Sequence, residues 1–397
     1  MRTVKNSQPI LAGAVAGIVG FSSSFTIVLA GLKAVGATDR QASSGLLALC
    51  VVMGAIGVVA SLRTKMPIVI AWSTPGAALM VTAGAMHGGF PAALGACVVA
   101  GVLTVIAGVW RPLARGIAAI PPALASALLA GVLLPVCLAP AHSMVQEPWL
   151  TTPVVLVWIG FMRFARRWAV PASVVAAVVA VVIKRPSSGG GFHPSLPHLA
   201  FVLPKFDIHT IVSFGIPLFI VTMACQNIAG MAVLRSFGYS PPMRPLMVAT
   251  GVASAATAPF GAHAINMAAL TAALVAGPDA DPEPERRWIA GATSGFLYIL
   301  LGPLAAVAAA LVVAAPAILV EAVAGLALLG ALTGALAAAV HDHETRDAAV
   351  ITLVVSVSGI TAFGISAPFW GLIAGLAFYG TRSIGFRRLP ATETASS

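Results

Sequence analysis

Charged residues are scarce in this 397-residue sequence. They make up 9% of it, whereas 59% of the residues are hydrophobic and the mean hydropathy is +0.99. A soluble chain of this length could not bury so much apolar surface, and it would need far more charge on its outside. The low charge therefore excludes a soluble globular protein and indicates one embedded in a membrane.

Signatures of enzymes and cofactors are also missing. The sequence has no P-loop, no dinucleotide-binding fingerprint and no Ser-His-Asp order. The run His341-Asp-His-Glu344 resembles a metal cluster, but it lies next to Arg346 in a predicted loop and is interpreted as a solvated charge run. We therefore expect no cofactor, no metal and no enzymatic activity. Any transport would be driven by an ion gradient or by the gradient of the solute itself.

Cysteines are few and scattered. Their spacing suggests neither a metal site nor disulfides, and small buried hydrophobes are the simplest interpretation. All four lie inside apolar runs, at Cys50, Cys97, Cys137 and Cys225.

Acidic residues are the rarer charge, with 12 Asp and Glu against 22 Lys and Arg. The basic excess does not indicate nucleic-acid binding, because Lys and Arg occur singly and in pairs between apolar runs, where they anchor and orient helices. Placing the N-terminus in the cytoplasm puts most of them on the cytoplasmic side. The outer side then keeps Lys33, Arg40, Lys184, Arg185 and Lys205. This bias predicts that both termini are cytoplasmic.

Apolar runs of about 20 residues recur from end to end, and each is long enough to cross about 30 Å of hydrocarbon. The first run, from Pro9, is followed by no small-residue cleavage site and is interpreted as a retained helix. An all-α polytopic membrane protein is therefore expected. Fourteen spans are predicted, at residues 9–32, 43–62, 67–86, 91–110, 117–139, 150–166, 168–184, 210–234, 244–257, 259–276, 287–309, 316–340, 347–363 and 366–381.

The two halves of the sequence resemble each other. Residues 32–38, LKAVGAT, match residues 234–240, LRSFGYS, and residues 122–131 match residues 316–325. Both matches pair span n with span n + 7. Because seven is odd, the second half would enter the membrane from the opposite face, which is the inverted repeat of secondary transporters. The flexible tract 185–191 forms a natural seam between the halves.

The third and tenth spans are both interrupted by Pro and Gly. Residues 68–72, IVIAW, predict an extended segment, and Pro75 follows at a favourable first position of a helix. The tenth span begins with residues 258–266, APFGAHAIN, which again place Pro and Gly before polar residues. Each span is predicted to form a short strand that leads into a half-helix, with the two strands paired. A Pro kink in an ordinary helix is the alternative.

Irregular backbone inside a membrane persists only where protein or a water-filled cavity satisfies it. Two half-helices from inverted halves would point their N-termini at one central space. Helix N-termini offer free N–H groups and a partial positive charge. We therefore predict that a small anionic or strongly polar solute binds near the middle of the membrane.

Polar side chains inside the spans are candidates for function. Gln226 and Asn227 lie in the eighth span, where they either face the cavity or join helices. His263 is predicted about one turn into the tenth half-helix, with Asn266 on the same face. His263 is a candidate proton carrier, or else a packing histidine. Glu321, the carboxylate inside the twelfth span, is a second proton-coupling or gate candidate, or else it extends to the interface.

Three stretches closely resemble the benzoate transporter (BenE) family. They are residues 71–79, AWSTPGAAL, residues 217–227, PLFIVTMACQN, and residues 258–266. The resemblance covers nearly the whole chain. It implies a benzoate:proton symporter of the bacterial inner membrane, related to nucleobase and sulfate-type anion transporters. Those relatives have a seven-plus-seven inverted-repeat fold and often form dimers, which makes a homodimer a candidate assembly.

The same resemblance implies a division into a core domain and a gate domain. The core comprises residues 1–110 and 210–309, and the gate comprises residues 111–184 and 310–385. A loop at 185–209 joins the repeats, and a tail follows at 386–397. In the nucleobase relatives, acidic residues on the eighth and tenth spans help to bind the substrate. Here Gln226 and His263 are found instead, which suits an anionic substrate because a fixed carboxylate would repel it.

The leading hypothesis is proton-coupled uptake of benzoate or a similar aromatic carboxylate by alternating access. The alternatives are the same fold carrying a nucleobase or another organic anion, a passive anion channel, and a membrane-embedded enzyme. The predicted polar substrate-binding residues are Ser73, Thr74, Pro75, Gly76, Gln226, Asn227, Gly261, His263 and Asn266. The predicted apolar wall for the ring comprises Phe21, Phe25, Trp72 and Phe260.

Overall fold

The computed structural model describes residues 2–184, 198–305, 307–308, 310, 315–362 and 365–386. Within these residues the chain is mainly helical, with two short antiparallel strand pairs. The predicted seam at 185–191 lies outside the described residues, as does nearly all of the predicted tail at 386–397.

The predicted spans coincide with single helices or with groups of shorter elements. The helices of the first half are α1 (Arg2–Ser22), α2 (Phe25–Ala34), α3 (Asp39–Thr64), α4 (Thr74–Ala83), α5 (Gly89–Val109), α6 (Arg111–Ala118), α7 (Pro122–Cys137), α8 (Ala139–Gln146), α9 (Pro148–Phe164) and α10 (Ala169–Lys184). Those of the second half are α11 (Ile208–Thr210), α12 (Ile216–Thr222), α13 (Ala229–Ser236), α14 (Met243–Thr257), α15 (Leu270–Ala276), α16 (Trp288–Leu301), α18 (Ala317–Val340), α19 (Arg346–Val357) and α20 (Ala367–Phe386). The short helices α6 and α8, which lie between predicted spans, were not anticipated.

Six helical stretches of the described chain are long and apolar enough to cross a membrane by themselves. They are Ser7–Ala34, Asp39–Thr64, Gly89–Val109, Pro122–Gln146, Ile208–Ser236 and Ala317–Val340. The chain is therefore a helical multi-pass membrane protein, whereas the count of fourteen crossings stays a prediction.

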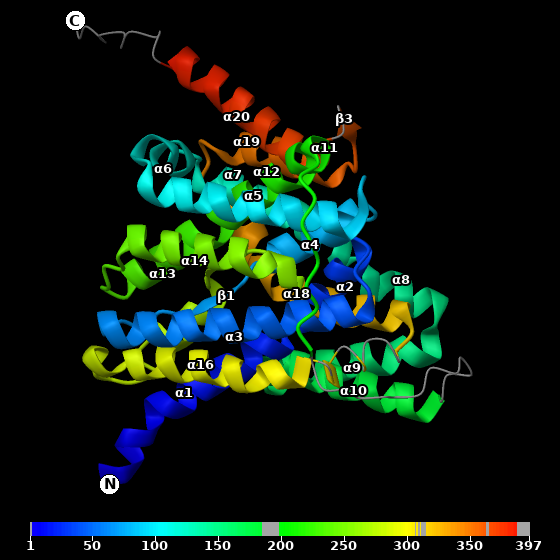
Figure 1. The fold of residues 1–397 in the computed structure, drawn as a ribbon, viewed down its shortest axis with the longest axis vertical. Helices are drawn as coiled ribbons and strands as arrows, with labels where there is room; N and C mark the ends of the chain where they lie inside the picture. Colours follow the sequence, from blue (N-terminus) through cyan, green and yellow to red (C-terminus); the bar gives the residue numbers. More distant parts are fainter. Residues whose placement is uncertain are drawn as a thin grey trace, which may run out of the picture.

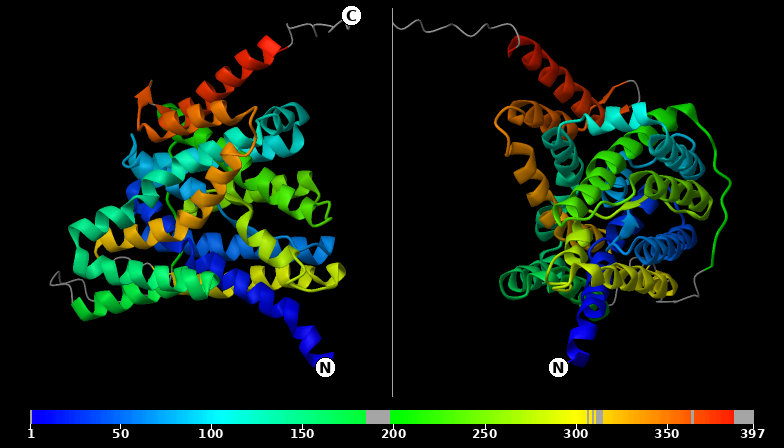
Figure 2. Two further views of the ribbon diagram at one scale, coloured as in Figure 1. Left: turned by 180° about the vertical axis from the view of Figure 1, so that it is seen from behind. Right: turned by 90° about the vertical axis from the view of Figure 1, so that its left-hand side faces the viewer.

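Four long helices stack side by side in the order α5, α14, α3, α16, as Figures 1 and 2 show. Paired glycines bring their backbones together. A Cβ on Gly54 of α3 would lie 2.5 Å from the carbonyl oxygen of Gly295 on α16, and a Cβ on Gly101 of α5 would lie 2.8 Å from that of Gly251 on α14. Small residues permit such close approach inside a membrane. Elsewhere α7 packs against α18 and α19, and α9 packs against α10.

The two predicted strands are present and paired. β1 (Ile70–Trp72) runs antiparallel to β2 (Ile265–Met267), with Ala71 opposite Asn266. Side chains satisfy the other edge of β2, because Ile265 N–H donates to the Ser254 hydroxyl at 2.8 Å and Met267 N–H donates to Asn227 Oδ1 at 2.9 Å. These bonds replace the water that an extended segment would lack inside a membrane. A second pair, β3 (Thr361–Ala362) and β4 (Ile365–Ser366), lies between α19 and α20.

The tenth span departs from the prediction in register. Pro259 belongs to a 3-10 turn, Ala258–Phe260, that extends α14, and Gly261 follows with a φ of 91°. Extended backbone then continues to the end of β2, and α15 starts at Leu270. His263 and Asn266 therefore precede the half-helix, and the prediction that they share one of its faces is wrong. A proline fits the first turn of a 3-10 helix as well as that of an α-helix, because N–H groups there have no helical partner. Pro259 alone therefore could not show that a 3-10 turn forms here and not the start of the half-helix.

Two other spans are irregular where smooth helices were expected. The first span breaks at residues 23–24, between α1 and α2. The eighth contains two π-helical segments, Ile211–Gly215 and Met223–Ile228. π-Helical turns occur frequently at functional sites.

Candidate substrate-binding cavity

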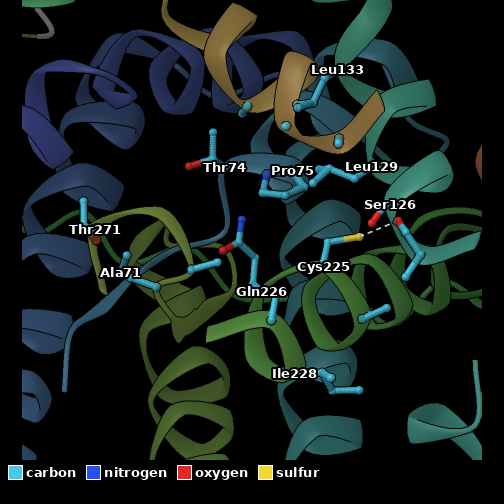
Figure 3. Close-up of a pocket in the computed structure, with 18 of the residues that line it drawn as sticks. Ala71, Thr74, Pro75, Ser126, Leu129, Leu133, Cys225, Gln226, Ile228 and Thr271 are labelled. Atoms are coloured by element: carbon cyan, nitrogen blue, oxygen red, sulfur yellow. Dashed lines mark hydrogen bonds between the residues drawn. The ribbon is translucent and has the colours of Figure 1, made fainter. Parts of the chain in front are cut away.

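A cavity of about 480 Å³ lies between the starts of α4 and α15 on one side and α7 and α18 on the other. Figure 3 shows side chains from these elements converging on it. No Asp, Glu, Lys, Arg or His lies among the described residues of its lining. The cavity can therefore stabilise a charged solute through dipoles and hydrogen bonds, without a fixed countercharge.

The predicted half-helix is present as α4, but it begins at Thr74, so Pro75 is its second residue and not its first. Ser73 is the N-cap, and its hydroxyl oxygen accepts from Gly76 N–H at 3.0 Å and lies 3.0 Å from the Thr222 hydroxyl. Ser73 and Gly76 are both buried and do not line the cavity, so their predicted contact with a solute is not found. Thr74 and Pro75 do line it, and they expose the N-terminal end of the helix with its partial positive charge.

Gln226 and Asn227 point to different places, although they are neighbours in the sequence. Both lie in the π-helical segment Met223–Ile228. Gln226 lines the cavity, and in Figure 3 its amide extends toward Thr74 and Pro75. Asn227 is buried, donates to the Met223 sulfur at 3.2 Å and accepts from β2. Gln226 thus faces the cavity, whereas Asn227 holds the strand that precedes α15.

Four uncommitted polar side chains face the cavity from four different elements. They are Thr74 of α4, Ser126 of α7, Gln226 of the π-helical segment and Thr271 of α15. None of them hydrogen bonds another described side chain or backbone group. Polar groups that are partly withdrawn from water need partners. Each hydroxyl and the amide can donate as well as accept, so together they offer several donors to a carboxylate, which is a pure acceptor.

An aromatic cluster supplies the wall on the side of β1. Trp72 lines the cavity, and its indole N–H donates to the Ser24 hydroxyl at 2.8 Å. Its ring meets Tyr298 edge-on at 5.9 Å between centroids and meets Phe21 at the same distance. Phe25 stacks on Phe21 at 5.3 Å and lies outside the lining, so it supports the wall and does not form it.

His263 is fully buried at the crossing of the two strands and does not line the cavity. Its Nε2 lies 3.0 Å from the Ser73 carbonyl oxygen. A carbonyl can only accept, so Nε2 carries the hydrogen. The other ring nitrogen, Nδ1, has no partner among the described residues.

Three more predicted residues of the tenth span do not line the cavity. With its amide oriented to satisfy both partners, Asn266 accepts from Ser73 N–H at 3.0 Å and donates to the Met267 carbonyl at 2.8 Å. Gly261 packs against the backbone of α3. Phe260 packs edge-on against Phe201 at 5.8 Å, away from the cavity.

Glu321 also lies outside the cavity. It is exposed near the start of α18, whereas the part of α18 that lines the cavity begins at Ala327. Exposure near a helix end fits the alternative in which Glu321 extends to the interface.

Among the lining residues that the sequence analysis missed, three carry a hydroxyl group that could contact a solute. Ser126 and Thr271 are isolated hydroxyls in Ala-rich helices, where no periodic pattern distinguishes a cavity-facing position. Tyr298 could have been suspected, because a tyrosine inside an apolar span needs a polar partner or a cavity.

The charge run at residues 341–344 forms the exposed turn before α19. Hydrogen bonds from Glu344 N–H at 3.1 Å and from the Thr345 hydroxyl at 2.9 Å lower the pKa of Asp342. Within the described ranges, no group of three or more His, Cys, Asp or Glu residues could hold a metal ion.

Comparisons with known proteins agree with this architecture. Residues 4–381 match the family model BenE, described as benzoate membrane transport protein. The chain is 37% identical over 372 residues to the inner membrane protein YdcO of Escherichia coli (strain K12), covering 93% of this chain and 94% of that one. It is 29% identical over 387 residues to the benzoate membrane transport protein of Acinetobacter baylyi, covering 96% and 97%.

Two solved structures share the fold at low sequence identity. The transmembrane domain of a cyanobacterium bicarbonate transporter, BicA, superposes with a TM-score of 0.59 at 15% identity, covering 93% of this chain and 98% of that one. The structure of SLC26A9 gives a TM-score of 0.62 at 13% identity, covering 95% and 66%.

Proposed function

Because the chain belongs to the benzoate membrane transport protein family, whose members are membrane transporters and not enzymes, we propose that it takes up benzoate or a similar aromatic carboxylate in symport with protons. The observation that carries the proposal is the cavity of about 480 Å³, in which an uncharged set of donors faces an aromatic wall. The inner-membrane relative YdcO supports the same cellular location for this protein.

The carboxylate binds at the start of α4. Its oxygens accept from the Gln226 amide and from the Thr74 hydroxyl, and the partial positive charge of α4 stabilises them. Thr271 and Ser126 close the polar side from α15 and α7. The ring lies against Trp72, where edge-on and stacked contacts are favourable.

Transport proceeds by alternating access between a core domain (1–110 and 210–309) and a gate domain (111–184 and 310–385). Two features support an underlying inverted repeat. β1 and β2 run antiparallel, as strands from inverted halves must. Matching span n with span n + 7 pairs α3 (span 2) with α14 (span 9) and α5 (span 4) with α16 (span 11). The contact between α5 and α14 therefore corresponds to the contact between α16 and α3. The cavity lies where the predicted core meets the predicted gate.

His263 is our candidate proton carrier. It is a buried ionisable side chain just before β2 that bonds to Ser73, the residue after β1. A proton would bind at Nδ1, the ring nitrogen without a partner among the described residues. Its bond to Ser73 would transmit the change in charge to the N-cap of α4. Glu321, the second candidate, is exposed and precedes Ala327, the first residue of α18 that lines the cavity.

Uptake of labelled benzoate into proteoliposomes tests the proposal. The native protein should accumulate benzoate against its gradient when the inside is alkaline, and a protonophore should abolish accumulation. Neutral benzoic acid also diffuses into alkaline vesicles, so only accumulation beyond that of protein-free liposomes rules out a passive channel. Competition by unlabelled nucleobases, bicarbonate and substituted benzoates identifies the solute. Uptake that ignores the pH gradient contradicts symport, and competition by a nucleobase or bicarbonate in preference to benzoate contradicts the choice of substrate.

A further inference from the structure

A second cavity, of about 320 Å³, lies at the opposite end of α4 from the first. The first turn of α4 lines the central cavity with Thr74, and its last turn lines the second cavity with Thr82. A helix of this length spans about 15 Å, so the two cavities are separated by the body of one half-helix. α7 behaves in the same way, with Ser126 facing the first cavity and Pro135 the second.

The second cavity lies on the same boundary between predicted core and predicted gate. Its core side is formed by the end of α4 and by the π-helical segment Ile211–Gly215, and its gate side by α7, α19 and the start of α20. The hydroxyl of Ser366 on β4 lies 3.5 Å from the carbonyl oxygen of Ser213, which joins gate to core at this point. In Figure 1, α11 and β3 lie at the right and α6 at the left, so the elements of the second cavity and α6, which the charge bias predicts to be cytoplasmic, lie on opposite sides of the molecule.

Basic groups gather at the rim of this cavity. The rings of His87 and His209 lie 6.0 Å apart, and both residues line it. The ammonium of Lys205 lies close by, 4.0 Å from where a Cβ on Gly88 would be. The carboxylate here, Asp207, is committed as the N-cap of α11, where it accepts from Thr210 N–H at 2.8 Å, and it lies 3.7 Å from His87 Nδ1. Basic groups therefore outnumber the acid at this rim.

The lining below the rim is amphipathic in the manner that an aromatic carboxylate requires. Hydroxyls come from Thr82, Ser213 and Thr361, and apolar surface comes from Phe214 and Ile360. Small-molecule sites combine such an apolar wall with a few convergent polar groups. The side chain of His87 is 77% exposed, so an anion can reach it from solvent.

We propose that the second cavity is a separate binding station for the aromatic carboxylate, where His87 and His209 hold the anion at the outer end of the core–gate boundary. This inference rests on the proposed function. It adds a site with its own residues, and a solute bound there would enter the central cavity after the boundary opens.

Protection of an engineered thiol tests the proposal. Thr361→Cys places an exposed thiol on the cavity lining, whereas the four native cysteines are buried. In intact cells a membrane-impermeant methanethiosulfonate reagent should modify this thiol, and benzoate should slow the modification. Replacing both histidines, His87→Ala and His209→Ala, should raise the half-protecting benzoate concentration about tenfold, the effect of losing one hydrogen bond to a charged group.

Two control variants separate this site from the central cavity. His142→Ala changes an exposed histidine outside both linings and should leave protection unchanged. Gln226→Ala weakens the central site and should also leave protection in place. The proposal is overturned if the thiol resists the reagent, if benzoate does not protect it, if the double histidine variant protects normally, or if Gln226→Ala removes protection. Protection without proteoliposome uptake would instead contradict the proposed symport and leave the second site standing.

Discussion

Gln226 provides the sharpest test of how the central cavity recognises its solute. Gln226→Glu keeps the shape of the side chain but replaces the amide N–H₂ donor with a carboxylate. If Glu and a bound carboxylate lie about 4 Å apart, the repulsion is about 4 kcal/mol at an effective dielectric constant of about 20. Because partial exposure of the cavity screens this value, we expect a rise in the KM for benzoate of at least about a hundredfold, which is about 2.7 kcal/mol.

Gln226→Ala removes the donor without adding a charge. A hydrogen bond to a charged group contributes about 1.5–3 kcal/mol, so the KM should rise about 10-fold to 100-fold. Both variants are compared with the native protein by initial rates of labelled benzoate uptake, with Ser236→Ala, exposed on α13, as the matched control. The order native, Ala, Glu in increasing KM is the expected result. Equal KM values for the Glu variant and the native protein would refute the assignment of Gln226 to the carboxylate.

Three further predictions concern the elements that hold the cavity. His263→Gln keeps an N–H donor for the Ser73 carbonyl but cannot titrate. Benzoate binding should therefore persist while accumulation driven by the pH gradient is lost. Retained accumulation would assign His263 a structural role alone. Gly54→Ala places a Cβ 2.5 Å from the Gly295 carbonyl oxygen and should lower the free energy of unfolding by about 1–3 kcal/mol. Gly330→Ala, where a Cβ would have no atom within 4 Å, should leave it unchanged. Equal thermal stability of the two variants in detergent would contradict this packing. Arg287 is buried and donates to the Ala276 carbonyl at the end of α15 at 2.9 Å. Arg287→Ala should therefore lower the free energy of unfolding by about 1.5–3 kcal/mol. Arg244 is exposed, so Arg244→Ala should leave the melting temperature unchanged in the same assay.

The first repeat was predictable because its chemistry is local. Ser73 and Pro75 mark a helix start by themselves, since the N-cap hydroxyl and the missing proline N–H both act within one turn. The β-branched residues ahead of them favour an extended segment, and β1 is found there. Thr74 was identified as a binding candidate because a polar group inside an apolar span is conspicuous in the sequence.

The second repeat was not predictable to the same degree because its register depends on distant partners. β2 persists over Ile265–Met267 because Ser254, 11 residues away, and Asn227, 40 residues away, accept from its N–H groups. The opposite directions of Gln226 and Asn227 arise from a π-helical turn, which has no pattern that sequence periodicity detects. Ser126 faces the cavity because of how α7 packs, which residue type alone cannot reveal.

The central claim is that an aromatic carboxylate binds between the start of α4 and the wall formed by Trp72 and Tyr298. A structure determined with 4-bromobenzoate, in which anomalous scattering locates the bromine, measures this directly. We expect the carboxylate within hydrogen-bond distance of Gln226 and Thr74, with the bromine inside the cavity of about 480 Å³. A fully occupied bromine elsewhere in the protein, with this cavity empty, would contradict the account.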